Sequence, residues 1–154
     1  MTLRIQIRAI GKLAKADPLQ KVTAEYIKRI KWPIDIQEHE VKAQIIGKLR
    51  QEHEAKFLLS NHPERAFCIA LDERGQNLSS ENFAKQIGNF QQKTSNIIFL
   101  IGGADGLTEQ VREQAKLIIS FGAMTWPHRL VRTLLIEQIY RAQTILSGHP
   151  YHRS

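Results

Sequence analysis

The chain alternates strand-like and helix-like apolar patterns, and this alternation constrains its fold more than any other feature. Residues 3–10 have the period-two pattern of a strand, and residues 18–31 carry apolar side chains at helical spacing. Further strands are predicted at 34–36, 66–71, 96–101 and 117–121, and further helices at 42–60, around Phe83 and Ile87, at 107–117 and at 127–146. Strands that alternate with helices predict an α/β fold with a mostly parallel sheet and helices on both faces.

We expect a single domain over residues 1–154, because a chain of this length can bury one continuous core. No apolar run reaches the length of a membrane span, and the first residues alternate like a strand, so we expect neither a membrane anchor nor a signal peptide. Cys68 is the only cysteine and lies in an apolar run. We interpret it as a buried structural thiol, which fits a cytoplasmic setting.

The charge balance favours a polyanionic partner. The formal net charge is +7, and such a surplus favours nucleic acid because binding releases counterions, although proteins that never bind nucleic acid also reach this value. From residue 119 onward the only acidic residue is Glu137, and the basic residues are Arg129, Arg132, Arg141 and Arg153. Arginine suits planar, two-pronged contact with phosphate.

Three segments follow predicted strands, where parallel sheets bind ligands. These are the segments after Leu71, after Ile101 and after Phe121. The second segment has the sequence GGADG, whose glycines permit close backbone approach to a ligand, although it matches neither the dinucleotide fingerprint nor a phosphate-binding P-loop. The third, GAMTWP, has the small and apolar residues that wrap an adenine. The alternatives are a plain tight turn and a helix lead-in with Met124 and Trp126 in the core.

The C-terminal residues 149–153, HPYHR, combine aromatic and cationic side chains that suit a nucleotide, although an inert terminus is the alternative. We expect no metal, because two histidines and a single distant cysteine do not make a ligand set. Asp72 and Glu73 are adjacent and would point to opposite faces, so they do not form a general acid–base pair. Glu137 and Arg141 lie one helical turn apart, which indicates a salt bridge or a substrate contact.

Taken together, these segments resemble the RlmH family of SPOUT ribosomal RNA methyltransferases. The matching segments are LDERG at 71–75, FLIGGADG at 99–106, TWPHRLVR at 125–132 with EQIYRA at 137–142, and HPYHR at 149–153. The resemblance extends over essentially the whole chain.

This resemblance implies an α/β fold with a C-terminal trefoil knot, which ordinary topology rules disfavour and no sequence pattern reveals. It also implies a homodimer that binds S-adenosyl-L-methionine in the knot loops and completes its substrate site with the partner subunit. The implied reaction is methylation of N3 of the pseudouridine at position 1915, in helix 69 of 23S ribosomal RNA within the ribosome.

The resemblance assigns cofactor binding to Leu71, Gly103, Gly122, Ala123, Met124, Thr125, Trp126 and Pro127. Leu71 and Met124 would wall the adenine, and Gly103 would permit close main-chain approach. Two positions depart from the family pattern. Gly122 stands where the family often has serine, and Trp126 is bulkier than the usual residue.

For the substrate, we predict binding by His128, Arg141, His149 and Tyr151, with His152, Arg153 and Arg132 as catalytic candidates. His152 would accept the ring proton, and the arginines would hold phosphate or an oxyanion. Methyl transfer would be direct, with no covalent enzyme intermediate. The competing hypotheses are a basic ribosome-binding protein without catalysis and a nucleotide-binding regulatory domain.

Overall fold

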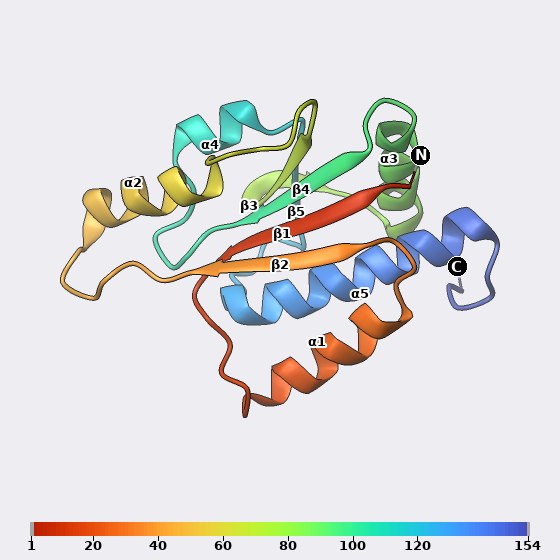
Figure 1. The fold of residues 1–154 in the computed structure, drawn as a ribbon, viewed down its shortest axis with the longest axis horizontal. Coiled ribbons are helices and arrows are strands. Elements are labelled where there is room, and N and C mark those ends of the chain that lie inside the picture. The colour runs from red at the N-terminus through yellow and green to blue at the C-terminus, as the bar shows by residue number, and fades with distance from the viewer. Residues whose placement is uncertain (1, 154) are drawn as a thin grey trace.

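The computed structural model describes residues 2–153 and contains a five-stranded sheet between two layers of helices (Figure 1). All neighbouring strands are parallel, in the order β2-β1-β4-β3-β5. The strands are β1 (Arg4–Ile10), β2 (Ile34–His39), β3 (Phe67–Asn77), β4 (Asn96–Ile101) and β5 (Leu117–Ser120). The helices are α1 (Pro18–Arg29), α2 (Gly47–Leu58), α3 (Ser80–Gln91), α4 (Glu109–Gln114) and α5 (His128–Ser147). The predicted α/β class with a parallel sheet is confirmed.

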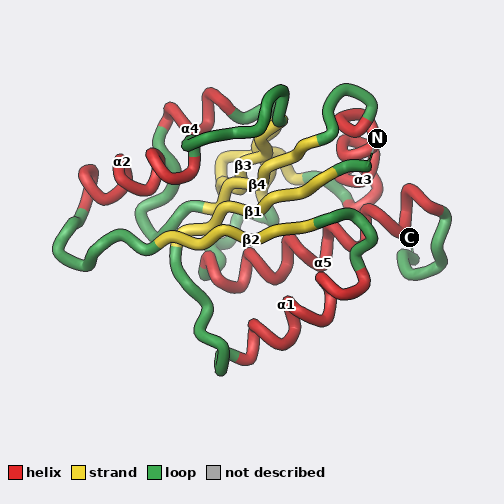
Figure 2. Tube along the Cα trace, viewed as in Figure 1, coloured by secondary structure: helices red, strands yellow, loops and turns green. Residues whose placement is uncertain are grey.

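Helices cover both faces of the sheet, as predicted. Helices α2 and α4 lie on one side of the strands and α1 and α5 on the other, and α3 packs against α5 (Figure 2). Because both faces are covered, the side chains of the central strand β4 are buried on both sides of the sheet. Phe99 and its neighbours at alternate positions join the core with α3 and α5, whereas Ile98 and Leu100 join the core with α2 and α4. A strand that is buried on both faces has a continuous run of apolar residues, and for this reason the predicted strand at 96–101 agrees with β4.

Helix α2 is shorter than the sequence predicted. It begins at Gly47 rather than at residue 42, and two of its apolar residues are exposed, Ile46 by 74% and Leu49 by 54%, whereas Leu58 is buried. The predicted start is wrong because Ile46 is the extended residue that precedes the first turn.

Strand β3 continues through the segment that was predicted as a loop after Leu71. Its pairing with β5 shifts between Leu71 and Gln76, so the strand is irregular there but resumes. Gly75 makes this possible, because a Cβ atom at that position would lie 2.7 Å from the backbone carbonyl of Ile118. The glycine therefore serves close strand approach rather than a turn.

Capping residues mark the ends of α3 and α5. Ser79 precedes α3 and accepts a hydrogen bond from the amide of Asn82 at 3.1 Å. Pro127 lies directly before α5, and Gly148 ends it in the left-handed conformation with φ of 76°. Within residues 2–153, no helix is both long enough and apolar enough to cross a membrane.

A buried carboxylate, Glu54 of α2, lies under the glycine loop that follows β4. Its side chain is 3% exposed, and neither oxygen has a hydrogen-bond partner within residues 2–153. A Cβ atom on Gly103 would lie 2.9 Å from Oε2 of Glu54, so the loop rests directly on this carboxylate. Burial raises the pKa of Glu54, and the opposing attraction of Arg50, whose Nε lies 3.4 Å from Oε2, is the smaller effect.

The raised pKa predicts that Glu54→Gln stabilises the protein at neutral pH, by about 1 kcal/mol in the free energy of unfolding. The stability contributed by this carboxyl is complete below its ordinary pKa and is lost as the pH rises through its folded pKa. The advantage of the variant is therefore expected to be smallest near pH ~4 and to grow toward neutral pH. Urea unfolding of both proteins over this range measures it; an advantage that is largest in acid would contradict the prediction.

Candidate functional site

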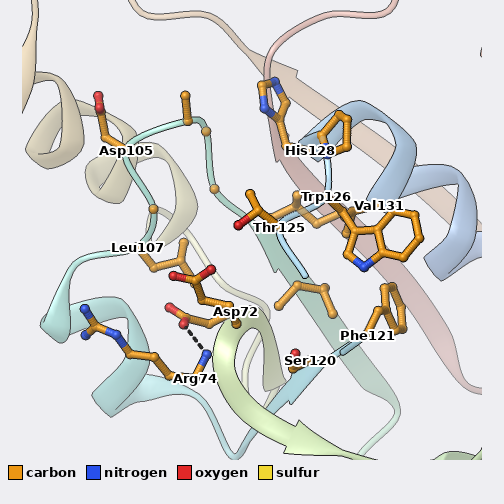
Figure 3. A pocket seen from close by; sticks show the side chains of 18 of the residues that line it. Asp72, Arg74, Asp105, Leu107, Ser120, Phe121, Thr125, Trp126, His128 and Val131 are labelled. Atoms are coloured by element: carbon orange, nitrogen blue, oxygen red, sulfur yellow. Dashed lines mark hydrogen bonds between the residues drawn. The ribbon is translucent and has the colours of Figure 1, made fainter. Parts of the chain in front are cut away.

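A cavity of about 680 Å³ opens at the carboxyl edge of the sheet (Figure 3). Its lining comes from three segments that are far apart in the chain: the irregular part of β3, the glycine loop after β4, and the connection from β5 to α5. The prediction that the segments after Leu71, Ile101 and Phe121 meet is thereby confirmed. A cavity of this size suits a ligand of nucleoside dimensions.

The cavity brings together the residues that were assigned to the cofactor, with one exception. Those that line it are Leu71, Gly103, Gly122, Met124, Thr125, Trp126 and Pro127. Ala123 lies in the same connection but is not part of the lining. Gly122 has φ of 124°, a conformation that favours glycine, so the serine usual in the family would be strained at this position.

One wall of the cavity is largely apolar. Phe121, Trp126 and Val131 gather on the same side of the view in Figure 3. Met124 is 77% exposed and Trp126 42% exposed, so the alternative that these two side chains belong to the core is wrong. Large apolar side chains exposed at a cavity mouth indicate a surface that a ligand covers.

The opposite side of the cavity is charged. Asp72 and Arg74 lie there in Figure 3, and Asp105 stands on the glycine loop. Oδ1 of Asp72 accepts a hydrogen bond from the amide of Arg74 at 2.8 Å. Arg112 of α4 contributes a guanidinium, which lies 3.6 Å from Oδ2 of Asp72 and donates to the carbonyl of Leu107 at 2.6 Å. The cavity is therefore divided into an apolar and an ionic half.

His128, predicted to bind substrate, stands at the start of α5 and lines the cavity. Burial lowers its pKa, and the positive charges of Arg129 and Arg132 lower it further, so its imidazole is neutral at neutral pH. A Cβ atom on Gly11 would lie 3.2 Å from Nε2 of His128. The loop after β1 therefore contacts the beginning of α5 beside the cavity.

Arg132, a predicted catalytic residue, is 2% exposed and lies outside the cavity lining. Its guanidinium forms an ion pair with Glu38 of β2 and donates to the carbonyl of Gly11 at 3.0 Å. Glu38 also accepts a hydrogen bond from the amide of Leu13 at 2.9 Å. This placement contradicts the prediction that Arg132 binds phosphate or an oxyanion, because its charge is buried and neutralised. Arg132 instead fastens the loop after β1 to α5.

The remaining predicted residues gather at the other end of α5. Arg141 donates to Oε1 of Glu137 through Nη2 at 2.7 Å, which confirms the predicted helix salt bridge. The hydroxyl of Tyr151 donates to the same oxygen at 3.0 Å. His152 contacts Nη1 of Arg141 at 3.0 Å through Nδ1 and Glu81 at 2.9 Å through Nε2. The C-terminal residues are therefore part of an ordered polar cluster.

This cluster does not share the cavity within one chain. In Figure 1, α5 begins beside the carboxyl ends of β1 and β2, and the C-terminus lies near its far end. A helix of 20 residues spans about 30 Å. Arg141, His149, Tyr151, His152 and Arg153 are consequently remote from Leu71, Gly103 and the connection before α5.

Sequence reasoning missed the ionic half of the cavity. Asp72 does not face Glu73 as half of a general acid–base pair, but its position directly after Leu71 is one at which the strand-end rule predicts ligand contact. The position of Arg112 in the cavity could not be predicted, because the apolar pattern of a helix does not show which of its polar side chains reach the neighbouring strand. Within residues 2–153, no group of three or more His, Cys, Asp or Glu side chains is placed to hold a metal ion.

Comparison with known proteins gives the family. The family model described as "Predicted SPOUT methyltransferase" matches residues 3–152. The "Ribosomal RNA large subunit methyltransferase H" of Rhodospirillum centenum is 48% identical, over 99% of this chain and 100% of that protein. The protein of the same name from Paramagnetospirillum magneticum is 46% identical, over 98% of this chain and 99% of its own length.

A solved structure shows the same fold. The probable methylase family protein from Haemophilus influenzae superposes with a TM-score of 0.56, at 11% identity, and the match covers 100% of this chain and 72% of that one. The family match, the close relatives and the shared fold agree with the cavity at the sheet edge. The chain therefore belongs to the SPOUT methyltransferase family and, within it, to the RlmH group.

Proposed function

We propose that this protein methylates ribosomal RNA of the large subunit, in the cytoplasm, with S-adenosyl-L-methionine as the methyl donor. The observation that carries the proposal is the meeting of three strand-end segments in one cavity with an apolar and an ionic half. The finer assignment, N3 of the pseudouridine in helix 69 of 23S ribosomal RNA, rests on the family resemblance. The trefoil knot also stays a prediction from that resemblance.

The cavity residues fit this donor in shape and polarity. The exposed faces of Met124 and Trp126 suit a purine, which needs apolar contact. The charged residues on the other side suit an amino acid group that carries both charges. Three carboxylates, those of Asp72, Glu73 and Asp105, line the cavity against two guanidinium groups, so the cavity has no surplus of positive charge for a polyphosphate, which argues against a nucleotide-binding regulatory domain.

When bound, S-adenosyl-L-methionine supplies a methyl group on a positively charged sulfur. The protein must hold the acceptor nitrogen in line with that group and receive the proton that N3 of the pseudouridine loses. His152 is our proposed proton acceptor. In this chain Arg141 donates to its Nδ1, which leaves the proton on Nε2 facing Glu81. Proton transfer to Nδ1 therefore requires that Arg141 move away.

The distance along α5 supports a homodimer in which each C-terminal cluster completes the cavity of the partner subunit. Within one chain, about 30 Å of helix separates the cavity from His152. In a two-fold symmetric dimer, the C-terminal cluster of one chain can lie beside the cavity of the other chain, and the symmetry repeats this contact at the second site. We propose that Arg141, His149, Tyr151, His152 and Arg153 bind the substrate in that arrangement.

Calorimetry and RNA analysis test the proposal together. We expect the protein to bind S-adenosyl-L-methionine and its demethylated product, with no competition from a nucleoside triphosphate. Mass analysis of 23S ribosomal RNA from a strain that lacks the gene should show one methyl group missing and regained on restoration. Binding to ribosomes without heat from either cofactor form would instead favour the basic ribosome-binding protein.

Completion across the dimer predicts that two inactive variants restore activity when they are combined. Gly103→Val should displace the glycine loop, because a side chain there would meet Glu54 at 2.9 Å and Ile10 at 3.1 Å. Deletion of residues 149–154 should leave cofactor affinity intact and remove methyl transfer. Dimers reassorted from the two variants should regain about a quarter of the wild-type rate on ribosomes, since half are mixed and each holds one complete site.

Differently tagged subunits establish that mixed dimers have formed, and thermal unfolding establishes that Gly103→Val is folded. Mixed dimers without activity would refute completion by the partner. Full activity of the deletion variant alone would remove the C-terminal residues from the site.

A further inference from the structure

The ionic half of the cavity contains a carboxylate and a guanidinium, those of Asp72 and Arg112, which lie 3.6 Å apart. We propose that Asp72 and Arg112 bind the amino acid group of the methyl donor, with Asp72 on its ammonium and Arg112 on its carboxylate. This inference rests on the proposed function and specifies how the donor is held.

Asp72 directly follows Leu71, and its side chain is 8% exposed. One oxygen, Oδ1, is used within the chain, where it accepts the amide hydrogen of Arg74 at 2.8 Å (Figure 3). The other oxygen, Oδ2, lies 3.6 Å from the nearest nitrogen of Arg112, which is beyond hydrogen-bond distance. A carboxylate this buried is stabilised by a close cationic donor, and Oδ2 is the atom that remains to receive one.

Arg112 is also only partly used. Its Nη1 donates to the carbonyl of Leu107 at 2.6 Å, which fixes the guanidinium between α4 and the glycine loop. Within residues 2–153, Nε and Nη2 make no hydrogen bond, and the side chain is 20% exposed at the cavity. The planar guanidinium thus keeps N–H groups for a carboxylate of a bound molecule.

An amino acid group places its ammonium and its carboxylate on the same carbon, so its receptor needs an acceptor and a cation side by side. Oδ2 of Asp72 and the guanidinium of Arg112 provide this arrangement at 3.6 Å. Asp72 stands across the cavity from the wall of Phe121, Trp126 and Val131 in Figure 3, and that wall suits the purine at the other end of the same ligand. Asp72 bound to the ribose hydroxyls is the competing arrangement.

Calorimetry with three probes separates these arrangements. S-adenosylhomocysteine has the whole amino acid group, its decarboxylated analogue keeps only the ammonium, and 5′-methylthioadenosine keeps the purine, ribose and sulfur but lacks the group. We expect Asp72→Asn to weaken the first two probes at least about tenfold and the third less than about twofold. Arg112→Gln should weaken S-adenosylhomocysteine alone. Glu113→Gln, which removes a charge on the same helix outside the cavity lining, is the matched control.

Each other outcome overturns the inference. If Asp72→Asn weakens all three probes equally, the carboxylate binds the ribose or merely holds the loop. If neither variant changes S-adenosylhomocysteine binding, Asp72 and Arg112 form only a structural ion pair. Wild-type protein that binds none of the probes would contradict the proposed function itself, and the amino acid subsite with it. Binding of 5′-methylthioadenosine by the variants keeps a subsite defect distinct from unfolding.

Discussion

Every strand of this sheet runs in the same direction, and the position of the cavity depends on that constraint. Parallel strands present all their carboxyl ends at one edge, so the irregular part of β3 and the segments after β4 and β5 lie side by side although they are far apart in the chain. The strand order places β3 between β4 and β5, which brings Leu71 beside both other segments. The backbone pairing of the strands therefore brings the three segments of the site together.

The side chains around the cavity divide into those that hold the segments and those that face a ligand. Arg132 and Glu38 belong to the first kind, because the ion pair between buried Arg132 and partly exposed Glu38 joins β2, the loop after β1 and α5. Removal of Glu38 would leave the buried charge of Arg132 uncompensated, which destabilises proteins strongly. Asp72 and Arg112 belong to the second kind, because each keeps bonding capacity toward the cavity.

The sequence predicted the fold where local pattern and burial agree. The strand predicted at 96–101 and the helix predicted at 127–146 agree with β4 and, to within one residue at each end, with α5. A strand covered on both faces is a continuous apolar run, and Pro127 and Gly148 mark the ends of the helix. The start of α2 was wrong because Ile46 and Leu49 are apolar yet exposed. The meeting of three segments followed from the strand-end rule, whereas the burial of Arg132 depends on Glu38, 94 residues away, and no local pattern reports such a partner.

Helix α5 has a consequence for how this chain tolerates change. Its first residue lines the cavity and Arg141, in its C-terminal half, contacts His152 of the C-terminal cluster, so the helix sets the distance between these two sites. One inserted residue would turn everything beyond it by about 100° and advance it by about 1.5 Å. Substitution of a solvent-facing residue leaves this geometry unchanged, whereas an insertion or deletion between Pro127 and Gly148 changes both the distance to the C-terminal cluster and the direction in which the cluster faces.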